Sequence, residues 1–377
     1  MNARSMRLLR SVAAGLLAGL WICWTASHAH GQTVLGGIGL GENTGSSGTT
    51  AGGMASYRGQ AAVVAGTALG IPTSVSDTGP LPCSGGAREA SLLEQDFYGM
   101  LSVAVCHAAT IGQDDVAYSE ASIGKLGFTT CNTIIVGGNT ISADFVMSRA
   151  LASCCMNGAS LGGQSDISGL VINGESIAVS GQPNQTVCLP GGKIVLNEQI
   201  TTQTADSADI TVNALHIVLC EGVDVVVSSS FAGVTCGGSC GEINPAPGEC
   251  ADFVTGGGWI TGTPSGAKAN FGVAGGIRNG EFWGHLNYID HGNGMHVKAT
   301  AVTGYEVDPN DPDCRIIDYD VTIDDASGTT ARVRVCDKGE PGRSDIFEIQ
   351  LSNGYFAGGD LGGSRPGGGN IQLHKCN

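Results

Sequence analysis

Hydrophobic and polar side chains alternate with a period of two along most of the chain, which is the pattern of half-buried β-strands. Before residue 241 the alternating segments are short and rich in small side chains, at residues 60–71, 101–110, 116–123, 141–152, 210–219 and 223–229. Asn173-Gly174 separates two further segments and supplies the positive φ angles of a type I′ hairpin turn. A second hairpin is predicted between residues 133–136 and 140–146. Residues 87–94 (AREASLLE) are the strongest helical candidate.

Beyond residue 250 the alternation becomes cleaner. In residues 317–323 apolar and polar side chains alternate strictly, and residues 330–335 and 347–351 repeat the pattern. Antiparallel strands with one face on the core and the other in water have this pattern. We therefore expect an all-β protein with little helix, built from two antiparallel β-sandwich-like domains in tandem.

Composition places the boundary between these domains. Residues 32–52 are rich in Gly, Ser and Thr and are typical of a flexible leader, and residues 241–250 (GEINPAPGEC) are typical of a linker. We expect a first β domain over residues 53–241, a linker over 242–250 and a second domain over 251–377. The chain has 61 glycines but is 42% hydrophobic, which favours short strands with glycine turns over disorder.

The first 31 residues have the layout of a secretory signal peptide. Arg4, Arg7 and Arg10 precede an apolar run that is shorter than the roughly 20 residues of a membrane-spanning helix. Removal of these three arginines from 18 basic residues leaves 15 against 34 acidic ones, a net charge of −19. A surface this acidic makes nucleic acid a poor partner. We expect a secreted or cell-surface-associated protein without a transmembrane segment once the signal is removed.

Thirteen of the 14 cysteines lie beyond the predicted signal peptide, where an oxidising compartment would allow disulfides. The odd number leaves at least one thiol free or available for an intermolecular disulfide. Cys314 and Cys336 should face each other in the hairpin of residues 317–335, so we expect them to form a disulfide. Cys250 and Cys376 bracket the second domain and are a further candidate pair. Adjacent Cys154 and Cys155 should point to opposite faces of a strand and find different partners.

A loop at residues 308–313 (DPNDPD) is the candidate metal site. Asp308, Asn310, Asp311 and Asp313 offer the hard oxygen ligands that Ca²⁺ prefers. The alternative is a solvated turn, because Asp and Pro are turn-forming residues and the spacing does not match an EF-hand. Apart from this candidate Ca²⁺ we expect no cofactor.

Three aromatic residues of the second domain are candidate ligand contacts. Trp259, Trp283 and Tyr288 would stack on sugar rings if they lined an exposed groove. Buried aromatics in a small β domain instead contribute to the core, so their exposure decides between the two roles.

Catalytic motifs are weak. Gly158-Ala-Ser160-Leu-Gly162 matches the nucleophile elbow of α/β-hydrolases, which needs a strand before it and a helix after it. The sequence shows no alternating βαβ organisation, and we expect Ser160 to lie in a glycine-rich turn. His285, His291 and His296 cluster around a predicted hairpin turn, and their spacing fits no established metal site. We therefore do not expect an enzyme.

Two sets of motifs resemble known exported proteins. Residues 254–260 (VTGGGWI), with GHL at 284–286, DHG at 290–292, GEPG at 339–342, DIF at 345–347 and LSNGY at 351–355, are similar to a small β domain near the C-terminus of exported bacterial surface proteins. Upstream, SDTGPL at 76–81, EAS at 120–122, NTISAD at 139–144, VSGQPNQT at 179–186 and NALH at 213–216 resemble the choice-of-anchor P family. The resemblance implies exported bacterial proteins that end in interchangeable anchoring tails and have no assigned catalytic activity. No sorting tail follows Cys376, which departs from that pattern.

The sequence thus predicts an exported extracellular or cell-surface protein with a structural or binding role and no catalytic activity. Cell-envelope components or polysaccharide are the expected partners. A carbohydrate- or calcium-binding surface module is the first alternative, and an unrecognised secreted hydrolase is the second.

Overall fold

The computed structural model describes residues 55–68, 70–97, 99–130, 138–155, 158–220, 222–237, 252–278, 280–340, 342–363 and 368–375. In this part of the chain all regular structure is β, with strands numbered β1 to β23, so the predicted fold class is confirmed. Over the same residues, no helix has the length and hydrophobicity to cross a membrane.

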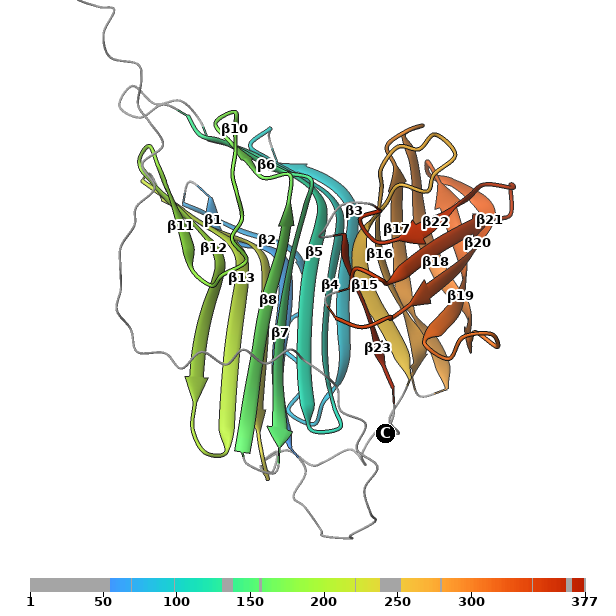
Figure 1. The fold of residues 1–377 in the computed structure, drawn as a ribbon, viewed down its shortest axis with the longest axis horizontal. Coiled ribbons are helices and arrows are strands. Elements are labelled where there is room, and N and C mark those ends of the chain that lie inside the picture. Colours follow the sequence, from blue (N-terminus) through green and yellow to red (C-terminus); the bar gives the residue numbers. More distant parts are fainter. Residues whose placement is uncertain are drawn as a thin grey trace, which may run out of the picture.

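The strands form three antiparallel sheets, called here sheets A, B and C (Figure 1). Sheet A contains, in spatial order, β11 (Gln185–Leu189), β12 (Gly192–Gln203), β13 (Ser207–Leu219), β14 (Val223–Thr235), β1 (Ser56–Ala68) and β2 (Ile71–Asp77). Sheet B contains β10 (Glu175–Ser176), β9 (Val171–Ile172), β6 (Thr140–Ala143), β5 (Val116–Thr129), β4 (Leu101–Gln113) and β3 (Gly86–Phe97), with β7 (Phe145–Cys155) paired to β5 and β8 (Gly158–Ser168) paired to β7. Sheet C contains β22 (Phe356–Asp360), β21 (Ile346–Leu351), β20 (Ala326–Cys336), β19 (Cys314–Ile323), β18 (Met295–Val307), β17 (Glu281–Asp290), β16 (Ala269–Arg278), β15 (Phe253–Ile260) and β23 (Gly369–His374).

Sheets A and B use strands from the first part of the chain and sheet C uses strands from the second. The change falls between β14 and β15, which bracket the predicted linker at residues 242–250. That linker, the predicted signal peptide and the predicted leader lie outside the described residues.

Sheets A and B pack face to face around a shared apolar core. Val64 of β1, Ile123 of β5 and Leu215 of β13 are fully buried members of this core. Burying an aliphatic side chain of this size stabilises the fold by about 1.5–3 kcal/mol. The alternation of small apolar and polar residues therefore forms a sandwich, as the sequence predicts.

Sheet C curls around a core of its own. Phe271 of β16 stacks on Phe347 of β21, with ring centroids 3.9 Å apart, although several strands separate β16 from β21 in the sheet. The Tyr319 hydroxyl of β19 donates to the Ala274 carbonyl of β16 at 2.8 Å. Strands from the two halves of the sheet thus meet across its interior, so sheet C buries a core without a second sheet.

The outer face of β15, β16 and β17 packs on sheet B (Figure 1). Glycines make this approach close: a Cβ atom at Gly257 would overlap Ser122 Oγ, and one at Gly272 would lie 2.9 Å from His107 Cβ. Since sheet A covers the other face, β4 and β5 are buried almost continuously rather than on one face. The expectation of half-buried strands is wrong here, because a third sheet covers the polar face.

One of the two predicted hairpins is confirmed, and the predicted helix is not. Asn173 and Gly174 have φ angles of 52° and 83° and join β9 to β10, as predicted. The prediction of a helix over residues 87–94 is wrong. These residues belong to β3, which pairs with β4 from Gly86 to Phe97. Pairing with a buried neighbour outweighs a weak helical propensity. The first arm of the other hairpin, residues 133–136, lies outside the described residues.

The predicted disulfide between Cys314 and Cys336 is present. The two residues are directly opposite in the β19–β20 pair, with Cα atoms 4.0 Å apart. Cys154 forms a disulfide with Cys236, whereas its neighbour Cys155 is exposed and free, so only one of the adjacent pair finds a partner. The candidate pair Cys250 and Cys376 lies beyond the residues that the structure describes.

The close approach of sheets B and C gives a testable prediction. We expect Gly257→Ala to lower the free energy of unfolding by roughly 1–3 kcal/mol, because the added methyl overpacks against Ser122. Ser122→Ala should be nearly neutral alone, since Ser122 Oγ makes no hydrogen bond to any described residue. In the double variant the loss should partly recover. Urea unfolding of the four proteins measures the coupling energy, and additive effects would contradict the proposed contact.

Candidate functional site

The loop predicted to bind calcium is a turn in which each carboxylate faces a cation. Asp308 Oδ2 accepts from Arg334 Nε at 2.6 Å, and its Oδ1 accepts from the backbone N–H of Asn310 at 2.9 Å. The hydrogen bond from Arg334 lowers the pKa of Asp308. Asp311 and Asp313 pair with Lys338 and Lys375, at 2.6 Å and 2.9 Å.

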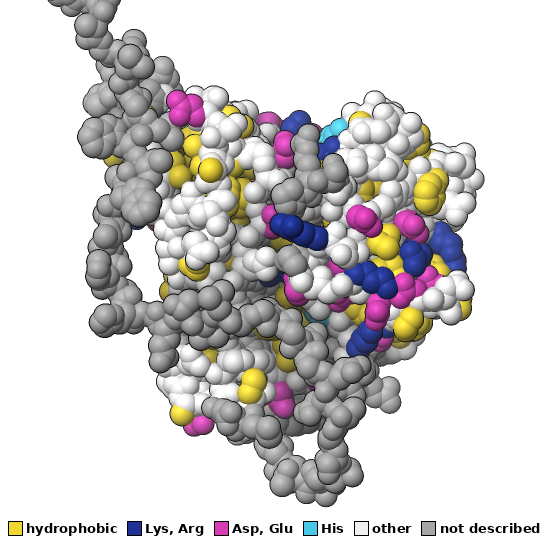
Figure 2. All heavy atoms as spheres, viewed as in Figure 1, with side chains coloured by type: hydrophobic (Ala, Val, Ile, Leu, Met, Phe, Trp, Pro, Cys, Tyr) yellow, Lys and Arg dark blue, Asp and Glu magenta, His cyan; other side chains and the backbone are white. Residues whose placement is uncertain are grey.

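This loop adjoins the outer face of sheet C, where acidic and basic side chains are interspersed (Figure 2). A calcium ion bound by the loop would compete with the cations already paired there. Asp311, Cys314 and Cys336 also lie close together. The two sulfurs are joined in a disulfide, so neither is the thiolate that a metal needs. Calcium binding stays a prediction from the sequence.

The three candidate ligand-contacting aromatics do not form an exposed groove, so that expectation is wrong. Trp259 is 4% exposed and packs against Phe145 and Met147 of β7. Tyr288 is fully buried on the opposite face of sheet C, inside its core. Trp283 is half-buried, and its ring centroid lies 5.4 Å from that of Phe253. Packing buries Trp259 and Tyr288, so these two rings cannot stack on a sugar.

The three histidines of the β17–β18 hairpin do not converge. His291 Nε2 hydrogen-bonds Asn270 Oδ1 at 2.7 Å, and His296 Nδ1 lies 3.9 Å from a Glu94 carboxylate oxygen. His285 points to sheet B instead. A shared metal site of these residues is therefore not formed.

Ser160 lies within β8, opposite Ser153 of β7. Its hydroxyl is 2.7 Å from Ser153 Oγ and 3.5 Å from Cys155 Sγ. A strand continues after Ser160 where a nucleophile elbow requires a helix. The elbow motif is a coincidence of small residues in an extended strand.

A chain of five hydrogen-bonded side chains connects sheet B to sheet C, and we call it the inter-sheet network. The Tyr118 hydroxyl donates to Glu120 Oε2 at 2.6 Å, and Glu120 Oε1 lies 2.8 Å from His107 Nε2. His107 Nδ1 lies 2.8 Å from His285 Nε2, and His285 Nδ1 hydrogen-bonds Glu89 Oε2. Tyr118, Glu120 and His107 are buried, while the Glu89 side chain is 27% exposed. The chain therefore runs from the interior to the surface.

Strand register brings these side chains together. Ala109 of β4 is opposite both Glu120 of β5 and Glu89 of β3, and His107 lies two residues before Ala109 on the same face. β17 contributes His285 from sheet C. Of the five residues, sequence analysis proposed only His285 as a candidate site residue. The polar residues Glu120 and His107, within otherwise apolar strands, are the signal that could have indicated the others.

The geometry fixes the number of protons in the network. Each of the four contacts needs one proton between its two heavy atoms, and the Tyr118 hydroxyl supplies the first. The other protons are shared between two carboxyl groups and two imidazoles. If both carboxyls are ionised, the two histidines carry three ring protons between them, which makes one neutral and the other an imidazolium.

Three groups of the network have shifted pKa values. Burial raises the pKa of Glu120 and of Glu89, but the hydrogen bond from His107 and the interaction with His285 respectively outweigh burial, so both pKa values lie below the ordinary value. Desolvation lowers the pKa of His107, which favours its neutral form. A neutral His107 can then donate through Nε2 to Glu120 and accept at Nδ1.

A second ion pair links the same two sheets beside the network. Arg149 of β7, opposite Glu120 in the register, donates to Glu340 Oε2 at 2.6 Å. The ring of His374 of β23 lies 5.3 Å, between centroids, from that of Tyr118 of β5, and desolvation lowers the pKa of His374 to about 4. Polar groups thus hold sheet C against sheet B at several points.

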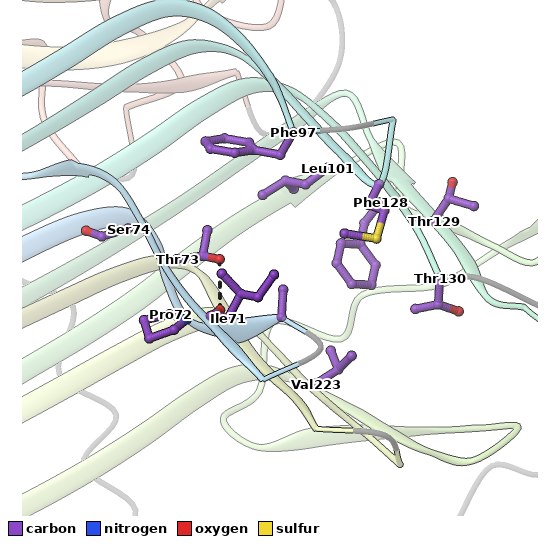
Figure 3. Close-up of a pocket in the computed structure, with 12 residues that line it drawn as sticks. Ile71, Pro72, Thr73, Ser74, Phe97, Leu101, Phe128, Thr129, Thr130 and Val223 are labelled. Atoms are coloured by element: carbon purple, nitrogen blue, oxygen red, sulfur yellow. Dashed lines mark hydrogen bonds between the residues drawn. The ribbon is translucent and has the colours of Figure 1, made fainter.

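A cavity lies at one end of the A–B sandwich, and we call it the apolar pocket (Figure 3). Its volume is about 270 Å³. Figure 3 shows Ile71, Phe97, Leu101 and Phe128 around a common space, with Val223 at its floor. No ionisable side chain is among the described residues that line it: Ala68, Ile71, Pro72, Thr73, Ser74, Phe97, Met100, Leu101, Phe128, Thr129, Thr130 and Val223.

The inter-sheet network and the apolar pocket are far apart. Glu89 and Phe97 lie on the same strand, β3, and at roughly 3.3 Å per residue they are separated by about 26 Å. General acid–base catalysis requires the acid or base within hydrogen-bond reach of its substrate. The groups capable of proton transfer and the cavity therefore do not meet.

No family model and no curated protein matches the chain. Among solved structures it is similar to a protein from Nitrosomonas europaea assigned provisionally as AttH, with 7% sequence identity, coverage of 85% of this chain and 92% of that chain, and a TM-score of 0.20. A similarity this low carries no functional argument. The resemblance to the choice-of-anchor P family stays a prediction from the sequence.

The inter-sheet network predicts a difference between two glutamates of β3. Glu89→Gln keeps the side-chain shape but removes the charge that faces His285, so we expect the free energy of unfolding to fall by about 1–3 kcal/mol. Glu94→Gln is the matched control, because the Glu94 side chain is 62% exposed, and its effect should stay within about 0.5 kcal/mol. Urea unfolding at neutral pH measures both, and equal losses would contradict the network.

The pH dependence of stability should contain two opposed contributions. The pKa of His374 is lowered from 6.5 to about 4, so its contribution is complete above pH 6.5 and is lost as the pH falls towards 4. Burial raises the pKa of Asp345 from 3.8 to about 7, so its contribution is complete below pH 3.8 and is lost as the pH rises through 7.

Two substitutions separate these contributions. Between pH 7 and pH 4, His374→Phe should reduce the loss of unfolding free energy on acidification, and Asp345→Asn should increase it, each by up to about 3 kcal/mol. Urea unfolding across this range measures the slopes. A change of the same sign in both variants would show that the assignment is wrong.

Proposed function

We propose that the protein is exported and acts outside the cytoplasm as a binding or structural protein rather than as a catalyst. The observation that carries this proposal is the separation of chemistry from cavity. The inter-sheet network lies between two sheets, away from the apolar pocket, and the pocket is lined by no ionisable side chain among the described residues. A pocket whose hydroxyls have no acid or base beside them among the described residues is suited to holding a molecule rather than to transforming it.

Export is supported by the cysteines and by the N-terminal sequence. Cys314–Cys336 joins the paired strands β19 and β20, Cys154–Cys236 joins β7 of sheet B to the end of β14 of sheet A, and Cys83 and Cys188 are also disulfide-bonded. Disulfides of this number persist in oxidising compartments. The signal-like residues 1–31 provide the route. The choice-of-anchor P resemblance supports a place at the cell surface, with envelope components or polysaccharide as partners.

Fractionation of a bacterial host that expresses the full chain tests this proposal, with a variant lacking residues 1–31 as the control. We expect the full chain in the medium or envelope and the variant in the cytosol. With a thiol-reactive polymer on non-reducing gels, Cys314, Cys336, Cys154 and Cys236 should be unreactive until reduced, because they are paired. A full chain found in the cytosol with all thiols reactive would contradict export.

The same gels report on intermolecular disulfides. Cys155 and Cys220 are exposed and free, so they are the described cysteines that could join two chains. A dimer that is lost on reduction and in Cys155→Ser or Cys220→Ser identifies the residue responsible.

A further inference from the structure

We propose that the apolar pocket binds an uncharged molecule with a short hydrocarbon body and one hydrogen-bonding head group, such as an alkyl alcohol, ester or amide. This inference rests on the binding role proposed above and names the class of ligand. It follows from the lining of the pocket, its size and the distribution of charge around it.

The walls of the pocket favour a hydrocarbon body. Phe97, Leu101, Phe128 and Val223 form its inner surface, and Leu101, Phe128 and Val223 are themselves members of the A–B core. Ile71 stands at the rim and is 62% exposed, which is unusual for so large an apolar side chain. An apolar molecule in this position would cover surface that otherwise faces water.

The size of the pocket suits a small molecule. A cavity of about 150 Å³ lined by aliphatic and aromatic side chains is enough to bind benzene. The apolar pocket, at about 270 Å³, is larger and opens to solvent, so it can take a short hydrocarbon chain whose end reaches the rim. Met100 adds a flexible side chain that can adjust to the shape of its occupant.

The polar groups of the pocket are hydroxyls. Thr73 and Ser74 contribute them from one side and Thr129 and Thr130 from the other (Figure 3). Thr73 Oγ1 donates to the Ile71 carbonyl at 3.2 Å, and Thr130 Oγ1 accepts from the Asn139 N–H at 2.7 Å. A hydroxyl can both donate and accept, so Thr73 can still accept and Thr130 can still donate. Such groups match an alcohol, ester or amide head.

A charged head group has no matching partner in this lining. Burying an ion without an opposite charge is strongly unfavourable, because the lost hydration is not replaced. An anion is disfavoured further by the net charge of −16 on the chain. The pocket should therefore select the uncharged molecule from a series with the same hydrocarbon chain.

Displacement of an uncharged fluorescent probe tests this selection on the exported protein. N-phenyl-1-naphthylamine should become fluorescent on binding, and 1-decanol should displace it at a concentration about tenfold lower than decanoate or decyltrimethylammonium, which corresponds to about 1.4 kcal/mol. All competitors are used below the concentration at which they form micelles. Failure of the probe to bind, or displacement by an ion equal to that by 1-decanol, would overturn the proposal.

A pair of variants locates the site. Ile71→Lys places a cation at the rim and should improve displacement by decanoate relative to 1-decanol by about tenfold. Ile200→Lys is the matched control, because Ile200 is 57% exposed on β12 and does not line the pocket. It should leave the selectivity unchanged, and thermal unfolding verifies that both variants fold. Equal selectivity in the two variants would place the probe elsewhere and overturn the proposal.

The outcomes remain distinguishable from those of the proposed function. Retention in the cytosol would contradict export and leave the displacement result intact. Failure of displacement would remove this ligand class and leave export intact.

Discussion

The contact between sheet B and sheet C is the constraint on which the rest of the structure depends. It is close because glycines stand where the strands meet: Gly257 against Ser122, and Gly272 against His107. A side chain at these positions would push the sheets apart. The VTGGGWI segment of the sequence thus has a physical role, since its middle glycine faces sheet B while the flanking glycines pack beside β23.

This contact determines how the polar residues of sheet B behave. β4 and β5 lie between sheet A and sheet C, so Glu120 and His107 lose access to water. The loss is offset only by partners within the protein, and the inter-sheet network supplies them in sequence from Tyr118 to Glu89. Because every contact needs a proton, the network is complete at one protonation state, and the gain or loss of a proton breaks a hydrogen bond. The same chemistry that resembles a catalytic relay therefore serves to join two sheets.

The end of the A–B sandwich that carries the apolar pocket lies away from the contact with sheet C. There the lining residues come from β1, β2, β14 and the ends of β3 to β5, and sheet C does not contribute to them. One surface of sheet B thus makes the polar contact with sheet C, and the apolar pocket lies at one end of the A–B sandwich. The apolar pocket is therefore separate from the titratable groups of the inter-sheet network.

The sequence by itself determined the local features of this protein. Period-two patterning predicted the strands, Asn173-Gly174 predicted a hairpin, and the positions of Cys314 and Cys336 predicted a disulfide. Each of these features depends on residues that are near in sequence or that face one another in a single hairpin. It misjudged residues 87–94, whose strand form depends on pairing with β4.

Only the tertiary structure decided which polar and aromatic residues are buried. Whether Trp259 and Tyr288 could contact a ligand depended on the packing of sheets, and His107 meets His285 across 178 positions of sequence. The apolar pocket likewise combines residues from Ala68 to Val223. Periodicity reports which side chains share a face of a strand, and it contains no information about which other sheet that face will meet.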